Sequence, residues 1–130
     1  LKLYLPLSCV SWREMNTKQL IKITIEALED IKANEIVVLE AEKNVSLFDY
    51  ILVASATSSR QANAIANHIR GKVKAAGGVV YGIEGERSGE WLLVDLGDVI
   101  VHIMQPTTRA YYNLEALWSE SAHYQNHLQP

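Results

Sequence analysis

The sequence has little cysteine: Cys9 is the single thiol among 130 residues. One thiol cannot form an internal disulfide, and without other thiols nearby it cannot form a cysteine-based zinc site. The apolar run over residues 3–10 is short, is interrupted by Pro6, and lacks both a basic leader and a small-residue cleavage site. These absences predict a cytoplasmic protein in a reducing compartment, with no membrane-spanning segment.

An excess of one charge is also lacking. The 15 acidic and 12 basic residues give a formal net charge of -3, and the Lys and Arg residues form no dense cluster. This balance argues against direct binding to the phosphate backbone of a nucleic acid. An acidic domain can still work inside a nucleoprotein particle by docking on a basic protein there, because opposite potentials steer the encounter.

The length and the hydrophobic content of 48% suit one domain with a substantial core. We expect residues 15–118 to form that domain, residues 1–14 to be a peripheral N-terminal extension, and residues 119–130 to be a tail without periodicity. Met15 stands directly before the first capped helix pattern. Residues 1–14 are therefore an upstream extension or follow a leucine-coded start.

Hydrophobic spacing places the first elements. Asn16-Thr17 offers an N-cap for an amphipathic helix that ends near Asn34. Two β-rich runs, over residues 35–40 and 48–55, are separated by a polar connection and predict an antiparallel pair. Ser58 or Ser59 then caps a second helix that ends at Gly77-Gly78. Its inner stripe is Ala62, Ile65, Ala66, Ile69 and Val73.

The second half of the domain is predicted as strands followed by a helix. A third strand covers residues 79–83, a polar loop covers residues 84–90, and a β-hairpin covers residues 91–104. Pro106-Thr107 opens a last helix, whose packed stripe is expected to be Tyr111, Leu114, Leu117 and Trp118. The order α-β-β-α-β-β-β-α predicts a single α/β domain with a mixed sheet of about five strands flanked by helices.

The hairpin sequence, W-L-L-V-D-L-G-D-V-I-V-H-I-M, carries the most information. Gly97-Asp98 suits a two-residue turn whose first central residue has φ > 0, which pairs Leu96 with Val99. Alternation gives an aliphatic face of Leu92, Val94, Leu96, Val99, Val101 and Ile103. The opposite face holds Trp91, Leu93, Asp95, Ile100, His102 and Met104. This mixture is unusual for an interior and typical of a protein-binding surface, and a one-residue slip would exchange the two sets.

The carboxylates of Asp49, Asp95 and Asp98 raise the alternative of metal-dependent phosphoryl or nucleotidyl transfer, because paired carboxylates commonly hold a divalent cation. On a strand, residues that share a face are two apart, whereas Asp95 and Asp98 are three apart with the turn between them. Asp98 is most simply a turn residue. The spacing disfavours catalysis, and an enzyme that uses these residues with magnesium remains the alternative.

Histidine and hydroxyl side chains offer no second catalytic pattern. His102 has no companion His or Cys at metal-ligand spacing, and the tail pair His123 and His127 offers no third ligand. Residues 55–60 precede a helix, where backbone N–H groups can hold an anion, but they lack the glycines of a phosphate loop. Hydroxyl capping beside a surface Arg60 is the favoured interpretation. We therefore predict no catalytic residue, no metal site and no cofactor.

Trp91 admits two interpretations. In the first, a C-terminal helix folds over the mixed face and turns it into a second core layer. In the second, the face has an exposed apolar centre with a polar rim, as hot spots have. That centre is Trp91, Leu93, His102 and Met104, and the rim is Asp95, Glu84, Glu86 and Arg87. The two interpretations predict different exposure of the indole.

Several spaced motifs in order resemble the Iojap family, the bacterial ribosomal silencing factors. They are Thr57-Ser58-Ser59-Arg60-Gln61, Glu84-Gly85-Glu86, Trp91, the run over residues 94–102, Arg109, Tyr112, Leu114-Glu115 and Leu117-Trp118. The similarity spans about residues 15–118. It implies a fold like that of nucleotidyltransferases without their catalytic carboxylates, and dimers in isolation.

The resemblance also implies a non-enzymatic function. A family member binds the large ribosomal subunit through its fourteenth ribosomal protein, at the face where the small subunit joins, and so represses translation in stationary phase or starvation. Matching positions place Trp91, Asp95 and His102 at the contact, with Glu84, Arg109 and Tyr112 flanking or positioning it. Leu93, Ile100 and Met104 join by the strand register alone. A regulator that binds some other protein on the same scaffold is a third interpretation.

Overall fold

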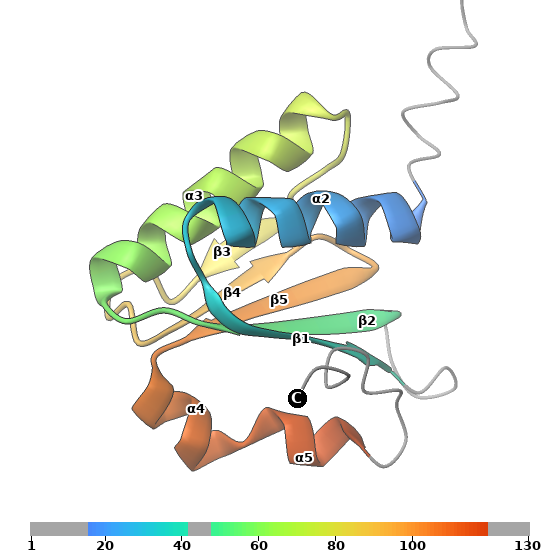
Figure 1. The fold of residues 1–130 in the computed structure, drawn as a ribbon. Helices are drawn as coiled ribbons and strands as arrows, with labels where there is room; N and C mark the ends of the chain where they lie inside the picture. The colour runs from blue at the N-terminus through green and yellow to red at the C-terminus, as the bar shows by residue number, and fades with distance from the viewer. Residues whose placement is uncertain (1–15, 42–47, 120–130) are drawn as a thin grey trace, which may run out of the picture.

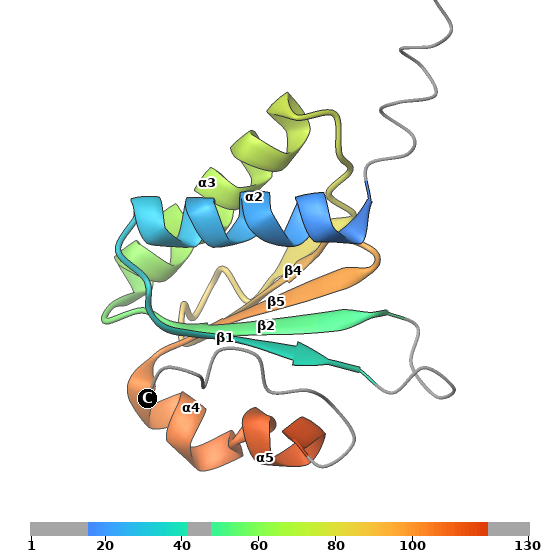
Figure 2. The same cartoon turned by 45° about the vertical axis from the view of Figure 1, so that its right-hand side comes forward.

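The computed structural model describes residues 16–41 and 48–119, which form a five-stranded sheet between two layers of helices. Helices α2 and α3 lie on one face of the sheet, and α4 and α5 lie beneath the other, as Figures 1 and 2 show from two sides. The predictions for residues 1–14, for the β1–β2 connection over residues 42–47 and for the tail beyond Ser119 fall outside the described residues. Within the described part, no helix is both long and apolar enough to span a membrane.

The two helices on the first face begin where their capping residues predict. Helix α2 (Thr17–Asp30) has a capping box, in which the Asn16 side chain accepts from the Gln19 N–H at 2.8 Å and the Gln19 side chain accepts from the Asn16 N–H at 3.3 Å. Helix α3 (Ser59–Ala75) has Ser58 as its N-cap. Its predicted inner stripe is confirmed, since all five of those side chains are fully buried.

The sheet is mixed, as predicted. Its strands are β1 (Asn34–Glu40), β2 (Tyr50–Ser55), β3 (Gly82–Glu84), β4 (Trp91–Asp95) and β5 (Val99–Met104). Their spatial order is β1-β2-β5-β4-β3, with β2 and β5 parallel and every other pair antiparallel. The strands at the centre therefore come from distant parts of the chain, and the three strands β3, β4 and β5 form a meander on one side.

The β4–β5 hairpin has the predicted register. Val94 pairs with Val101, and the Leu96 N–H donates to the Val99 carbonyl at 2.9 Å. Gly97 has φ 90°, while Asp98 does not have positive φ, which fits a type II′ turn. The aliphatic face is buried throughout, at 0–4% exposure, beneath α2 and α3. The first half of the face assignment is thus confirmed.

Two predicted elements differ in the structure. Strand β3 covers only Gly82–Glu84, because the chain before it makes an isolated bond, from the Tyr81 N–H to the Asp95 carbonyl, rather than a regular ladder. The last helix is divided into α4 (Pro106–Tyr112) and α5 (Leu114–Ser119) by Asn113, which is left-handed at φ 47°. The break changes the direction of the helix, so the predicted stripe is wrong for Tyr111 and Leu117, which are 80% and 68% exposed, whereas Leu114 packs against the sheet as expected.

Replacing Gly97 with alanine should lower the free energy of unfolding by about 1–2 kcal/mol, since an L-residue is strained at this φ. An added Cβ would also lie 2.9 Å from a Tyr81 ring carbon. Gly82→Ala is the matched control, because no atom lies within 4 Å of its added Cβ. Urea denaturation of both variants measures the difference, and equal stabilities would contradict the turn geometry.

Candidate protein-binding site

The second face of the sheet is graded from apolar to acidic. One row runs across four paired strands as Val53, His102, Leu93 and Glu84, and the adjacent row contains Ile51, Ile100 and Asp95. Val53 and Ile51 are buried, the β5 and β4 side chains of these rows are partly buried, and Glu84 is exposed. The strand register therefore brings the predicted contact residues of β3, β4 and β5 onto one continuous surface.

Trp91 is the centre of an aromatic chain that joins this surface to α4. Its indole ring lies 4.8 Å from the Tyr112 ring and 5.9 Å from the His102 ring, measured between centroids. Tyr112 in turn makes an edge contact with Tyr111 at 4.9 Å. Tilted and edge contacts of this kind are the favoured geometries of aromatic pairs. We call the side chains of Tyr111, Tyr112, Trp91 and His102 the aromatic ridge.

His102 is held as a neutral imidazole. The Trp91 indole N–H donates to its Nδ1 at 2.9 Å, which requires Nδ1 to be unprotonated. Burial lowers the pKa of His102 from 6.5 to about 4, because the charged form loses its hydration. The imidazole is therefore part of the uncharged centre of the surface at neutral pH, and the hydrogen bond fixes the orientation of the indole.

Helices α4 and α5 cover only part of the second face. Met104 is fully buried and packs with Val37, Leu39, Ile51 and Val53, against which Leu114 of α5 is also placed. The prediction that Met104 belongs to an exposed centre is therefore wrong, since it faces β2 and the helices rather than solvent. The mixed face is a second core layer at β1 and β2, and Trp91 packs against this layer while staying partly exposed, so its role as a contact residue stays a prediction.

Arg109 connects this covering layer to the sheet from a buried position, with 7% of the residue exposed. Its Nε and Nη2 both lie 2.7 Å from Oε2 of Glu115, and its Nη1 donates at 2.8 Å to both the Glu35 carbonyl and the Ser55 hydroxyl. The sequence-based prediction placed Arg109 at the edge of the contact but did not identify Ser55, Glu35 or Glu115 as its partners. No spacing in the sequence pointed to these partners, since Arg109 and Glu115 are six residues apart and lie on different helices.

The surface around Trp91 is rich in carboxylates. Five of the 15 acidic residues, but one of the 12 basic residues, lie in the sequence between Val79 and Asp98, although Asp98 itself is at the turn, where its carbonyl accepts from the Asp49 N–H. Glu84 and Glu86 are exposed, whereas Asp95 is partly buried and its carboxylate accepts from the Gly97 N–H at 2.9 Å. Asp95 therefore stabilises the turn as well as contributing charge. The arrangement is an uncharged centre with a negatively charged rim.

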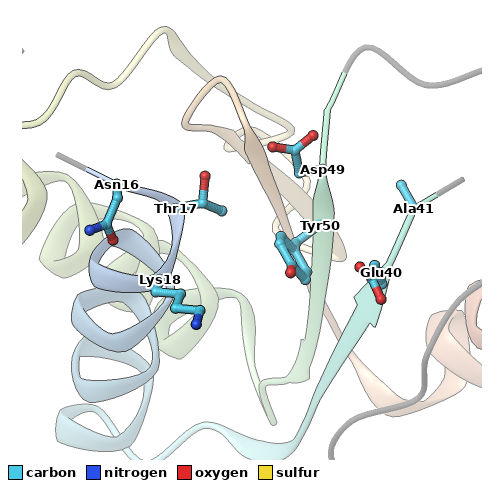
Figure 3. A pocket seen from close by; sticks show the side chains of 7 residues that line it. All are labelled: Asn16, Thr17, Lys18, Glu40, Ala41, Asp49 and Tyr50. Carbon is cyan, nitrogen blue, oxygen red and sulfur yellow. The ribbon is translucent and has the colours of Figure 1, made fainter. Parts of the chain in front are cut away.

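The three aspartates considered for catalysis lie at the turn end of the sheet, where the Asp49 N–H donates to the Asp98 carbonyl at 2.7 Å. Their side chains are used differently: the Asp95 carboxylate accepts from the Gly97 N–H, Asp98 is exposed, and Asp49 lines a hollow of about 680 Å³ at this end, opposite Trp91. Figure 3 shows that hollow between the start of α2, the end of β1 and the start of β2. Among the described residues, no group of three or more His, Cys, Asp or Glu side chains is arranged to hold a metal ion.

The hollow combines one ammonium group with two carboxylates. Lys18 lies at the start of α2, and Glu40 and Asp49 lie across from it (Figure 3). Burial, followed by the negative charges of Glu40 and Asp49, raises the pKa of the Tyr50 hydroxyl. The hollow is thus separate from the aromatic ridge in position and in chemistry.

The segment before α3 serves the fold, as hydroxyl capping predicts. The Ser58 hydroxyl accepts from the Gln61 N–H at 3.0 Å, and the Ser59 hydroxyl donates to the Ser88 carbonyl at 3.1 Å. The Ser55 hydroxyl is already used by Arg109. These bonds account for three hydroxyls of the segment and attach the β3–β4 loop to α3.

Comparison with known proteins gives one consistent family. The family model described as "Ribosomal silencing factor during starvation" matches residues 14–129. A ribosomal silencing factor from Chromobacterium violaceum is 50% identical over 104 residues, which are 80% of this chain and 85% of that protein. Mouse mitochondrial assembly of ribosomal large subunit protein 1 is 30% identical over 102 residues, covering 76% of this chain and 45% of that protein.

The fold comparison agrees. A crystal structure of a Chromobacterium violaceum protein, 50% identical in sequence, superposes with a TM-score of 0.77 and covers 80% of this chain and 87% of that chain. The region matched by the family model includes the aromatic ridge, Arg109 and α5. The relatives named above carry the names of silencing and assembly factors rather than of enzymes.

We expect an NMR titration to give His102 a pKa of about 4, because burial removes the hydration of the charged imidazole. Trp91→Phe, which removes the donor, should raise that pKa toward 6.5. In the unfolded chain His102 takes up a proton near pH 6.5, whereas in the folded protein it does so only near pH 4. Above pH 6.5 the imidazole is neutral in both states, so the free energy of unfolding does not depend on its titration there. That free energy should fall by up to about 1.4 kcal/mol per pH unit between pH 6.5 and 4. A wild-type pKa near 6.5 would contradict the described environment.

Proposed function

The chain belongs to the ribosomal silencing factor family, and we propose that it represses translation by binding the large ribosomal subunit through its fourteenth ribosomal protein. Bound there, it sterically blocks joining of the small subunit in stationary phase or starvation. The observation that carries this proposal is the partly buried, hydrogen-bonded Trp91 at the centre of an acidic-rimmed surface. The site of action is the cytoplasmic ribosome.

The aromatic ridge has the composition of an interface centre. Tyr and Trp are enriched at such centres because they bury a large area at a low cost in side-chain entropy. Trp91 is already held by His102 and Tyr112, so little further ordering is needed on binding. The described geometry thus supports docking of a preformed surface.

The charges of the surface favour a basic partner. Glu84 and Asp95 flank the uncharged Leu93 on the second face, while Glu86 and Arg87, the one basic residue between Val79 and Asp98, are exposed in the loop after β3. Complementary charge at the rim accelerates association and rejects acidic partners. A ribosomal protein is such a partner, and the name of the mouse relative refers to the large subunit.

The proposed mechanism needs occupancy and no turnover. A domain seated where the subunits meet excludes the small subunit by its volume, so no catalytic residue and no cofactor is part of the proposal. Self-association, which the family resemblance implies, would use the same apolar surface. Dimer formation and ribosome binding are then expected to compete.

Trp91→Ala should weaken binding to large subunits by about thirtyfold, equivalent to about 2 kcal/mol, because it removes the central anchor. Sedimentation of purified large and small subunits with added protein measures both co-migration and loss of joined ribosomes. Tyr81→Ala is the control, since Tyr81 is an exposed aromatic beside the Gly97 turn, away from the ridge. Circular dichroism verifies that both variants are folded.

The outcomes of that experiment are distinct. Binding by the wild type and by Tyr81→Ala, with loss in Trp91→Ala, supports the proposal. If folded Trp91→Ala binds as tightly as the wild type, the surface is wrongly chosen. If the wild type neither binds the large subunit nor hinders joining, the proposed function itself is wrong.

Reversing one rim charge should slow association. Glu84→Lys should bind about fivefold more weakly at low salt, because Glu84 is exposed beside Leu93 and its carboxylate is placed to attract a basic partner. Glu29→Lys changes the net charge equally, but Glu29 is exposed on α2, over the other face of the sheet. Surface-bound large subunits allow both association rates to be measured at two salt concentrations. An equal effect of the two variants would show that net charge alone acts.

A further inference from the structure

We infer that Arg109 is a positioning residue for the docking surface: its buried guanidinium holds α4 so that Tyr112 packs against Trp91. The inference rests on the proposed function and extends it, because it names a residue that controls the surface without belonging to its exposed part. Arg109 is 7% exposed, so a bound partner has little access to it. Its influence on docking must therefore pass through the residues that it holds.

The guanidinium joins four elements at one point. It lies on α4, bonds Glu115 of α5 through Nε and Nη2, and bonds Glu35 of β1 and Ser55 of β2 through Nη1. The partner on β2 is held firmly, since Ser55 ends a strand inside the sheet and is 4% exposed. The planar fork of arginine can make these contacts together, whereas the single nitrogen of lysine cannot.

The first strand has a conformation that suits this bond. Glu35 has φ 50°, uncommon for a residue with a side chain, and the β1–β2 register shifts between Asn34 and Val37. The irregular stretch contains the carbonyl that accepts from Arg109 at 2.8 Å. A strained backbone conformation persists only where surrounding contacts hold it. Here one such contact is the hydrogen bond that Arg109 of helix α4 donates to the Glu35 carbonyl.

Helix α4 needs such an anchor. It has seven residues and α5 has six, and helices this short are marginal unless tertiary contacts hold them. Asn113, left-handed between them, separates the two helices. Because Tyr112 is the last residue of α4 and stands three positions after Arg109, the orientation of the guanidinium sets the position of the ring against Trp91.

The experiment compares Arg109→Lys with Leu28→Ala. Leu28 is fully buried in the core beneath the other face, so its truncation lowers stability without touching the ridge. The readouts are the Trp91 indole N–H signal, which is the one lost in Trp91→Phe, and the affinity for large subunits. Arg109→Lys should shift the indole signal, raise the pKa of His102 toward 6.5 and weaken binding at least tenfold. Leu28→Ala should change none of these at temperatures where it is folded.

A second variant covers the case in which Arg109→Lys does not fold. Tyr112→Ala removes a ring that is 53% exposed and leaves the Arg109 contacts intact. It should reproduce the indole shift and the weaker binding, and failure to do so would overturn the inference. An unchanged indole signal in folded Arg109→Lys, or wild-type affinity despite a shifted signal, would overturn it as well. Failure of the wild type to bind subunits would instead overturn the proposed function, because the indole readout needs no ribosome.

Discussion

The register of the β4–β5 hairpin is the constraint on which both faces of the sheet depend. With Gly97 at the first turn position, the even-numbered side chains of β4 enter the core beneath α2 and α3, while Trp91, Leu93 and Asp95 face the other way. A slip of one residue would place an indole and a carboxylate in the apolar core. Because burying these groups would cost much free energy, the register is fixed, and Trp91, Leu93 and Asp95 stay on the second face.

Among the described residues, the second face is only partly covered, and the boundary of this cover follows from the short helices α4 and α5. Leu114 packs over the β1–β2 half with Met104, whereas Tyr112 reaches only as far as Trp91. A longer unbroken helix would bury more apolar area and would stabilise the monomer. Because the helix is broken at Asn113, this extra apolar area is not buried. The apolar surface around Trp91 therefore stays partly accessible.

Much of this arrangement can be predicted from the sequence because its signals are local. Asn16 and Ser58 cap helices, Gly97 fixes a turn, and alternation assigns each hairpin side chain to a face. A C-terminal helix over the mixed face is one of two interpretations of the sequence, but which side chains it buries, Met104 among them, could not be decided, because this depends on contacts between residues far apart in the chain. The bond from Arg109 to Glu35 spans 74 positions, and the left-handed Asn113 has no clear signal in an otherwise helical pattern.

In the proposed function, different parts of the site would set the rate at which the protein meets a ribosome and the rate at which it leaves. The acidic rim acts at a distance and governs encounter, whereas the uncharged ridge acts at contact and governs escape. The proposed steric block would require slow escape, since only an occupied site can exclude the small subunit. A neutral His102 serves that requirement, because a charged imidazole would have to be desolvated beneath a basic partner. The low pKa of the imidazole and the aromatic side chains therefore have the same effect. Both keep the middle of the surface uncharged, while the carboxylates around it would attract a basic partner.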